Sequence, residues 1–242
     1  MNQVIQQLKE RKSVRVFADR QIPPEEVSAI LEAAVNAPTA GNQQLYTIIH
    51  VTDPALKAQL AETCDHQPFI ATAPLVLVFC ADCRKWYNAF LEYNCDPRKP
   101  GLGDLMLAIS DTNIAAQNAV VAAQSLGIGS CYIGDIMENA EQQRQLLSLP
   151  PYVFPAAMLV MGYPTEQQLK LAKPPRAEMR HIVHENSYRD MDAEELKQML
   201  SGKAGARSFE EWILAFCNRK YNSDFSREMT RSVQVFLEDY RG

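Results

Sequence analysis

The chain has 242 residues, 47% of them hydrophobic, which is enough for one large domain with a sizeable core or for two small domains. Its 29 acidic residues outnumber its 24 lysines and arginines, and the net charge of −5 argues against a general nucleic-acid or membrane-surface binder. The opening residues MNQVIQQLKERK contain no apolar signal core, and six cysteines without such a signal favour reduced thiols, so we expect a cytoplasmic protein.

The first third of the chain predicts helices and strands in alternation. Residues 3–10 predict a short helix that leads into the basic run RKSVR at 11–15. In PPEEVSAILEAAVNAP, a proline suits the first helical turn, apolar residues repeat at helical spacing, and Pro38 stops the helix. A loop, APTAGNQQ, then precedes an expected strand, LYTIIHVTD, whose His50 is expected to be a core histidine with satisfied nitrogens. A helix at 54–64 follows, and APLVLVFCAD predicts a strand buried on both faces.

The rest of the chain continues the pattern to about residue 165. We expect a helix near 83–93, a Pro- and Gly-rich loop, and a long helix at 104–126 whose polar residues, Asp111 among them, exclude a membrane span. GSCYIGDI is a strand end or loop, and a helix and the buried strand FPAAMLVMGYP follow it. This alternation indicates an α/β or α+β layered fold.

The last part of the chain is expected to differ from this body. Residues 171–188 look extended, and the tail from 192 predicts two or three amphipathic helices. We therefore expect a body over residues 1–190 and a helical C-terminal extension over 191–242, which belongs to the same domain or forms an excursion from it.

The usual catalytic motifs are missing from the sequence. GIGSCYIG and GLGDLM each begin with a Gly-x-Gly pair but lack the third glycine of a dinucleotide fingerprint, and there is no P-loop or G-x-S-x-G elbow. Cys80 and Cys83 have the CxxC spacing of a thioredoxin-like pair or of half a zinc site. Buried structural thiols are the simpler interpretation, because no second pair completes a metal set. We expect no metal site and no catalytic side chain.

The run RKSVR raises a separate question, because it concentrates cations in an acidic chain. It is either a solvated surface cluster or an anion site in which arginines, a hydroxyl and backbone N–H groups hold a phosphate. Four more loops combine cations, hydroxyls, amides and glycines next to predicted elements: PTAGN at 38–42, HQPF at 66–69, CYIGD at 131–135 and KPPR at 173–176.

As an ordered set, these segments resemble the nitroreductase-type FMN oxidoreductase family, most closely its larger NADPH-preferring branch of nitroreductases and flavin reductases. ERKSVRVF is similar to the family's Arg-x-Ser-x-Arg phosphate segment, and NAPTAGNQQ to its Ala-Pro-Ser/Thr-x-x-Asn-x-Gln loop. SDTNIAAQNAVVAAQSLGIGSCYIGDI resembles its central dimer helix and flavin-facing turn, and IVHENSY closes the body. The resemblance covers essentially the whole chain.

The resemblance implies an α+β layered fold. Its central, mostly antiparallel sheet would be flanked by helices, with a long dimer-interface helix and a helical C-terminal tail. It also implies a homodimer with FMN at two interfacial sites and ping-pong electron transfer from NADPH or NADH to a small-molecule acceptor: a nitroaromatic, a quinone or a flavin. No nucleic acid or membrane partner is implied. A thiol–disulfide oxidoreductase using Cys80 and Cys83, and a non-catalytic flavin-binding sensor, remain the alternatives.

The resemblance also assigns roles to residues around the phosphate. Arg11 and Ser13 would hold the ribityl phosphate, Lys12 would contribute only its backbone, and Arg15 would face the flavin N1 and C2 carbonyl. Arg176 would reach the phosphate from the end of the body together with Lys173. The sequence KPPR replaces the family's Lys-Pro-Arg, however, and shifts this lysine by one residue.

The remaining assignments concern the ring and the electron donor. Gln67 would bind the pyrimidine edge, and the backbone of Tyr132, Ile133, Gly134 and Asp135 would lie near N5. Asp135 replaces a glycine common in the family and is expected to point outward. The other subunit would contribute Pro38, Thr39, Ala40 and Asn42. Lys203 and Arg207, in the loop SGKAGARS, are either ligands of the NADPH 2′-phosphate or solvated loop charges.

Overall fold

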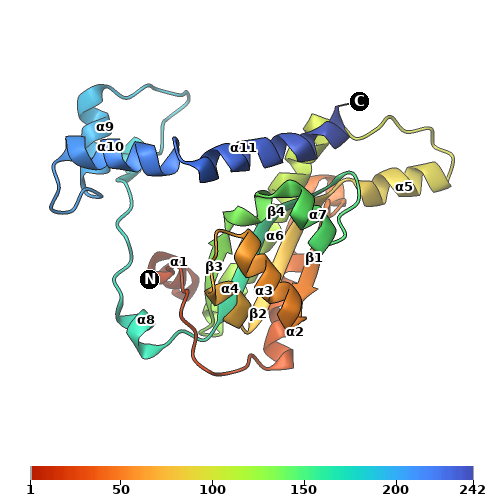
Figure 1. The fold of residues 1–242 in the computed structure, drawn as a ribbon, viewed down its shortest axis with the longest axis horizontal. Helices are drawn as coiled ribbons and strands as arrows, with labels where there is room; N and C mark the ends of the chain where they lie inside the picture. The colour runs from red at the N-terminus through yellow and green to blue at the C-terminus, as the bar shows by residue number, and fades with distance from the viewer. Residues whose placement is uncertain (1, 242) are drawn as a thin grey trace. The chain divides into compact units, whose positions relative to one another are not determined.

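A computed structural model describes residues 2–241 and contains a four-stranded sheet with helices on both faces (Figure 1). The strand order is β1-β2-β4-β3, and every neighbouring pair is antiparallel. The strands are β1 (Tyr46–Val51), β2 (Leu75–Asp82), β3 (Gly129–Ile133) and β4 (Val153–Gly162). The structure confirms the expected α+β fold with its antiparallel sheet, and it leaves β1 and β3 at the edges.

Two hydrophobic cores lie on opposite faces of the sheet. Successive side chains of a strand point to opposite faces, so Leu77 of β2 packs with α2 (Pro24–Val35) and α6 (Leu102–Ser125). Its neighbour Val78 belongs to the other core, with α3 (Pro54–Thr63), α7 (Ala140–Leu146) and the end of α11 (Asp224–Leu237). Every residue of β2 and β4 is buried as a result. The predicted burial of both strands on both faces is confirmed.

The predicted helices of the first unit begin and end close to where the sequence places them. The side chain of Asn2 caps α1 (Gln3–Glu10), and α2 begins at a proline followed by two glutamates, which favour a helix N-terminus. α5 spans Arg84–Glu92. Two short helices, α4 (Phe69–Thr72) and α8 (Glu166–Lys170), were not predicted. Within residues 2–241, no helix is long and apolar enough to cross a membrane.

The prediction of a core histidine at position 50 is wrong. His50 is exposed, although it pairs in register with the buried Leu77 of β2. Because β1 is an edge strand, it has a neighbour on one side only, and the end of such a strand is poorly covered. The apolar residues around His50 were therefore a misleading guide to its burial.

Contacts divide the chain into two compact units. The first contains the residues up to Leu171 together with those from Glu228 onward, and the second contains Ala172–Arg227. The boundary between these contact units lies at 171/172, and the last residues belong to the first unit. The expected division into a body and an extension at 190/191 stays a prediction. The second unit holds α9 (Ala193–Ser201), α10 (Phe209–Lys220) and the start of α11, as expected for a helical tail. The stretch at 171–188 is irregular, with one short 3-10 turn.

Candidate functional site

The basic run RKSVR is fixed along the edge of the sheet. Ser13 forms a parallel bridge with Ser130 of β3, and the N–H of Val14 donates to the Ser130 carbonyl at 3.0 Å. Farther along, Phe17 forms an antiparallel bridge with Pro164, just after β4. Residues 13–17, which the sequence places outside any strand, therefore pair with the sheet at two separate points. These two bridges fix the backbone of the segment.

Two glycines allow this close approach. A Cβ atom at Gly129 would lie 2.5 Å from Cγ2 and 2.7 Å from Cβ of Val14. A Cβ atom at Gly162 would lie 2.8 Å from a ring carbon of Phe17. Such distances are far shorter than van der Waals contact, so a larger residue at either position would push the segment away from the sheet.

Arg11 has a donor with no acceptor. Arg11 caps the end of α1, its guanidinium donates to Ser130 Oγ at 3.4 Å, and it lies 5.8 Å from the centre of the Tyr132 ring. The Nε atom is buried and has no hydrogen-bond partner among residues 2–241. A buried donor without a partner is costly, and a bound anion would relieve that cost.

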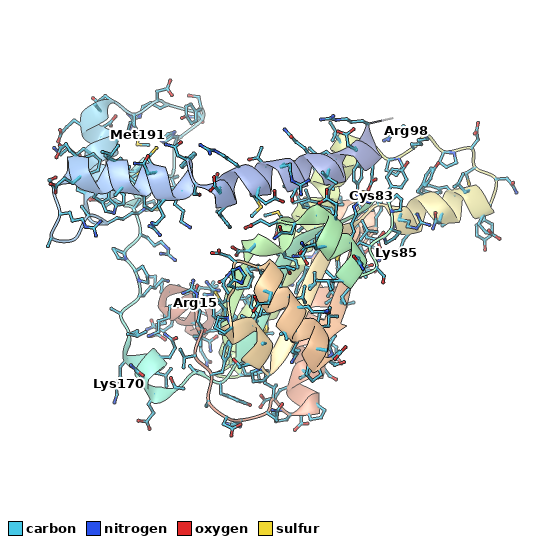
Figure 2. The ribbon with its side chains drawn as sticks, in the orientation of Figure 1. Arg15, Cys83, Lys85, Arg98, Lys170 and Met191 are labelled. Atoms are coloured by element: carbon cyan, nitrogen blue, oxygen red, sulfur yellow. The ribbon has the colours of Figure 1, made fainter. Side chains whose placement is uncertain are left out.

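The other two cations of the run differ from Arg11. The ammonium of Lys12 donates to the carbonyl oxygens of Leu169, at 2.7 Å, and Leu171, and so ties the run to the end of α8. The side chain of Arg15 is exposed, and its backbone N–H donates to Oε1 of Gln168 at 3.3 Å. Figure 2 labels Arg15 in the segment between α1 and α2, and Lys170 in α8. The Lys12 ammonium thus stabilises the contact between the basic run and the end of α8, whereas the guanidinium of Arg15 is exposed to solvent.

The turn after β3 borders open space. β3 ends at the buried Ile133, and a 3-10 turn, η2 (Gly134–Met137), follows. Gly134 is exposed, and a Cβ atom there would meet nothing within 4 Å. Burial raises the pKa of the Tyr132 hydroxyl to about 12, despite the opposing effect of the Arg11 guanidinium. Asp135, which we expected to point outward, is half-buried.

The loop at 38–44 is positioned by a buried carboxylate of α6. Oδ1 of Asp111 accepts from the N–H of Ala40 at 2.9 Å, and Oδ2 accepts from the N–H of Leu45 at 3.4 Å. The hydroxyl of Thr39 accepts from the N–H of Gln44 at 3.1 Å. Pro38 and Asn42 remain exposed beside these fixed residues. From the sequence, Asp111 indicated only that this helix does not span a membrane. Its role in supporting the loop was not predictable, because the residues it contacts lie about 70 positions away in the chain.

The remaining predicted ligands are placed separately. Gln67 is half-buried in the turn after α3, and its side-chain amide donates to the Cys64 carbonyl at 2.8 Å. Lys173 and Arg176 belong to the second unit, where the Arg176 guanidinium donates to the Pro174 carbonyl at 3.3 Å. The first unit therefore brings together Arg11, Ser13 and the turn after β3. The buried donor of Arg11 without an acceptor fits a phosphate, and the backbone at Gly134 is open to a bound group.

The cysteine pair does not have the properties of a redox site. Cys80 and Cys83 are buried, and burial raises the pKa of each thiol to about 12. A reactive thiolate needs a lowered pKa and some exposure. Across residues 2–241, no three His, Cys, Asp or Glu side chains are arranged to hold a metal ion. The geometry therefore disfavours the thiol–disulfide alternative.

The second unit contains a separate hollow of about 330 Å³ on α10 and the loop before it. Arg207 lines it together with Trp212, Phe216 and Arg219, whereas Lys203 lies exposed outside it. Two guanidinium groups beside aromatic rings can bind a phosphate and stack a base. Of the two loop cations, the structure favours Arg207 as a ligand.

Comparison with known proteins gives consistent matches. A sequence model of the Nitroreductase family matches residues 8–163. The protein named FMN reductase [NAD(P)H] from Bacillus subtilis (strain 168) is 31% identical over 240 residues, which cover 98% of this chain and 92% of that protein. The oxygen-insensitive NADPH nitroreductase of Salmonella typhimurium is 36% identical over 194 residues, 79% of this chain and 77% of that one. The solved structure of B. megaterium NfrA2 has a TM-score of 0.81 and 32% identity, and covers 99% of this chain and 98% of its own.

Proposed function

The chain belongs to the nitroreductase family, and on that premise we propose that it is an FMN-dependent oxidoreductase that passes electrons from NAD(P)H to a nitroaromatic, quinone or flavin acceptor. FMN, when bound, supplies the redox chemistry, while the protein binds, orients and tunes it. Because the cofactor would carry out the chemistry, the site needs no nucleophile and no general base, and the sequence has no motif for either. The observation that carries the proposal is the basic run fixed on β3 with the buried, unpartnered Nε of Arg11.

We propose that the two arginines of the run have different tasks. Arg11, held near Ser130 and Tyr132, would bind the ribityl phosphate together with the hydroxyl of Ser13. Arg15, whose head group is free of the sheet, would face the flavin N1 and C2 carbonyl. A preorganised cation there stabilises developing negative charge, which in such sites contributes several kcal/mol. Lys173 and Arg176 would add charge to the phosphate.

The open backbone at Gly134 supports a position for the ring. The turn from Tyr132 to Asp135 would lie near N5, and Gln67 would turn its amide from the Cys64 carbonyl toward the pyrimidine edge. The carboxylate of Asp135 would add negative charge to this turn and make the flavin harder to reduce.

We further propose that the protein is a homodimer in which Pro38, Thr39, Ala40 and Asn42 of one subunit complete the flavin site of the other. Leu102, Met106, Leu107 and Ile114 are exposed apolar side chains of α6, a helix whose other face is buried in the core. Large exposed apolar surfaces mark interaction sites. The rigid attachment of the 38–44 loop to Asp111 would carry the loop to the interface together with α6.

The Arg207 hollow supports NADPH as the donor. Arg207 and Arg219 would bind the 2′-phosphate, and Trp212 or Phe216 would stack on the adenine. An anion ligand at this hollow would distinguish NADPH from NADH, which lacks that phosphate.

The proposed function is tested with an absorption spectrum of the purified protein after addition of FMN and gel filtration. We expect bound flavin near 450 nm, and we expect anaerobic NADPH to bleach it. Protein that stays colourless would contradict the proposal. Bound FMN that NADPH and NADH both fail to reduce would favour a flavin-binding sensor instead.

A further inference from the structure

Glu138 differs from the other buried carboxylates of the protein. Asp82, Asp111 and Glu138 are the buried acidic residues within the described part of the chain. Asp82 accepts from the Thr47 hydroxyl at 2.6 Å and from two backbone N–H groups, and Asp111 accepts from two backbone N–H groups. Glu138 is 5% exposed, and its Oε1 is buried without any partner among residues 2–241. Among the described residues, no hydrogen bond compensates negative charge on Oε1 at this position.

The charges around Glu138 make ionisation still less favourable. Burial, and then the carboxylates of Asp135 on η2, Asp65 after α3 and Glu228 on α11, raise the pKa of Glu138 to about 7. The thiol of Cys64 is neutral, because burial, Asp135 and Glu138 raise its pKa to about 12. On α11, the cation Arg231 is engaged by Glu141 and Glu228, at 2.8 Å each. Glu138 therefore faces acidic or neutral groups from three elements.

Glu138 also occupies a defined place in the proposed site. It follows η2 directly, and η2 begins at the glycine turn expected beside the flavin. Asp65, which acts on Glu138, lies two residues before Gln67, the expected partner of the pyrimidine edge. Glu138 therefore directly follows one of the two segments that would border the ring, and its carboxyl group feels the charge of a residue beside the other. Asp65 is exposed, so one member of this acidic cluster is in contact with solvent.

The proposed reaction requires a group that can gain and lose a proton here. A hydride from NAD(P)H carries two electrons and one proton, whereas reduction of a quinone or a nitro group by two electrons consumes two protons. The second proton must come from solvent. Negative charge that arrives beside an uncompensated buried carboxylate increases the affinity of that carboxylate for a proton.

We propose that Glu138 stores this second proton. Its carboxylate takes one proton from solvent when two electrons enter the site, and the carboxylic acid gives up that proton, by way of solvent, to the acceptor as the acceptor takes the hydride. The overall reaction stays NAD(P)H plus H⁺ plus acceptor to NAD(P)⁺ plus reduced acceptor. The inference rests on the proposed function for its role in turnover, but not for the titration of Glu138 itself.

The titration is tested first, in the protein without FMN. Infrared spectra recorded between pH 5 and 9 should show a protonated carboxyl band that disappears with a midpoint near pH 7. The band should be absent in Glu138→Gln and unchanged in the control Glu32→Gln, which alters an exposed glutamate of α2. A band that is already gone by pH 5, or one that persists in Glu138→Gln, would overturn the proposal.

Proton uptake on reduction is the second test. Holoenzyme in weak buffer at pH 8 is reduced anaerobically with NADPH, and an indicator dye reports the protons consumed per two electrons. Wild type and Glu32→Gln should take up more protons than Glu138→Gln, by as much as one. Equal uptake with normal reduction would refute the role of Glu138 alone, whereas failure to bind or reduce FMN would refute the proposed function.

Discussion

At the scale of single residues, Arg11 and Arg15 are only four positions apart but have different surroundings. Arg11 is held against Ser130 and has a buried Nε without a partner, and Arg15 is exposed. We expect Arg11→Leu to weaken FMN binding about tenfold or more, since a charge-assisted hydrogen bond contributes roughly 1.5–3 kcal/mol. We expect Arg15→Leu to slow flavin reduction more than it weakens binding.

Fluorescence titration gives the FMN affinity of each variant, and stopped-flow absorbance gives its reduction rate. Lys12→Leu is a useful comparison, because that ammonium is bound to carbonyl groups at the end of α8. Equal losses of affinity for Arg11→Leu and Arg15→Leu, with no change in reduction rate, would contradict the division of tasks.

Arg207 is expected to determine the choice of donor. Arg207→Ala should raise KM for NADPH by about tenfold, consistent with the loss of one ionic contact, and should leave KM for NADH nearly unchanged. Lys203→Ala, which lies outside the hollow, should change neither value much. Steady-state kinetics with both donors measures these KM values. An equal rise in KM for NADH would show that Arg207 does not contact the 2′-phosphate.

Glu138 should also affect stability in a pH-dependent way. Its pKa is about 7 in the folded protein and 4.5 in an unfolded chain. Between these values the folded state binds more protons than the unfolded state, so this contribution to stability is lost as pH rises from about 4.5 to 7. Glu138→Gln should therefore unfold at a higher temperature than wild type at pH 8, by the equivalent of roughly 1–3 kcal/mol.

The same variant should differ little from wild type near pH 5, where the native carboxyl is already protonated. Thermal unfolding by circular dichroism at the two pH values measures this, with Glu32→Gln as the control. A difference between Glu138→Gln and wild type that is the same at both pH values would contradict the expected protonation.

At the scale of elements, the attachment of residues 13–17 to the sheet is the decisive feature. Gly129→Ala would place a Cβ atom 2.5 Å from Val14 Cγ2, and such overpacking costs typically 1–3 kcal/mol. We expect lower stability and weaker FMN binding together, because the segment proposed to bind the phosphate must move. Adding Val14→Ala should restore part of both, as measured by thermal unfolding and flavin titration. Unchanged FMN affinity in Gly129→Ala would show that the position of the segment does not matter for binding.

The elements that the sequence predicted well are those with strong local signals. Prolines and acidic residues mark the starts of α2 and α3, and continuous apolar runs mark β2 and β4. α4 and α8, of four and five residues, are too short to show helical periodicity, and their formation depends on tertiary contacts. The exposure of His50 likewise depends on the position of β1 at the edge of the sheet. The order of strands in a sheet cannot be read from a single sequence.

Tertiary contacts also explain which site residues the sequence did not reveal. Gln168, Asp111 and Ser130 hold predicted site segments from far away in the chain, through contacts that only the folded sheet brings together. The orphaned carboxylate of Glu138 becomes visible only when every possible donor around it is known. By contrast, RKSVR and the turn CYIGD were identifiable because the motifs form an ordered set along the chain.

At the scale of the whole molecule, the proposed FMN site would be assembled from distant segments of two subunits. The phosphate segment and the turn after β3 belong to the first unit, and Lys173 and Arg176 to the second. The loop at 38–42 would come from a second copy of the chain. If this proposal is right, activity should require the dimer.

A crystal structure of the protein saturated with FMN tests this claim most directly. The account predicts a dimer in which the phosphate lies within hydrogen-bond distance of Arg11 and Ser13. The ring should lie against the backbone of Gly134, and residues 38–42 of the other subunit should contact the same flavin. A flavin bound elsewhere, or bound by one subunit without its partner, would contradict the account.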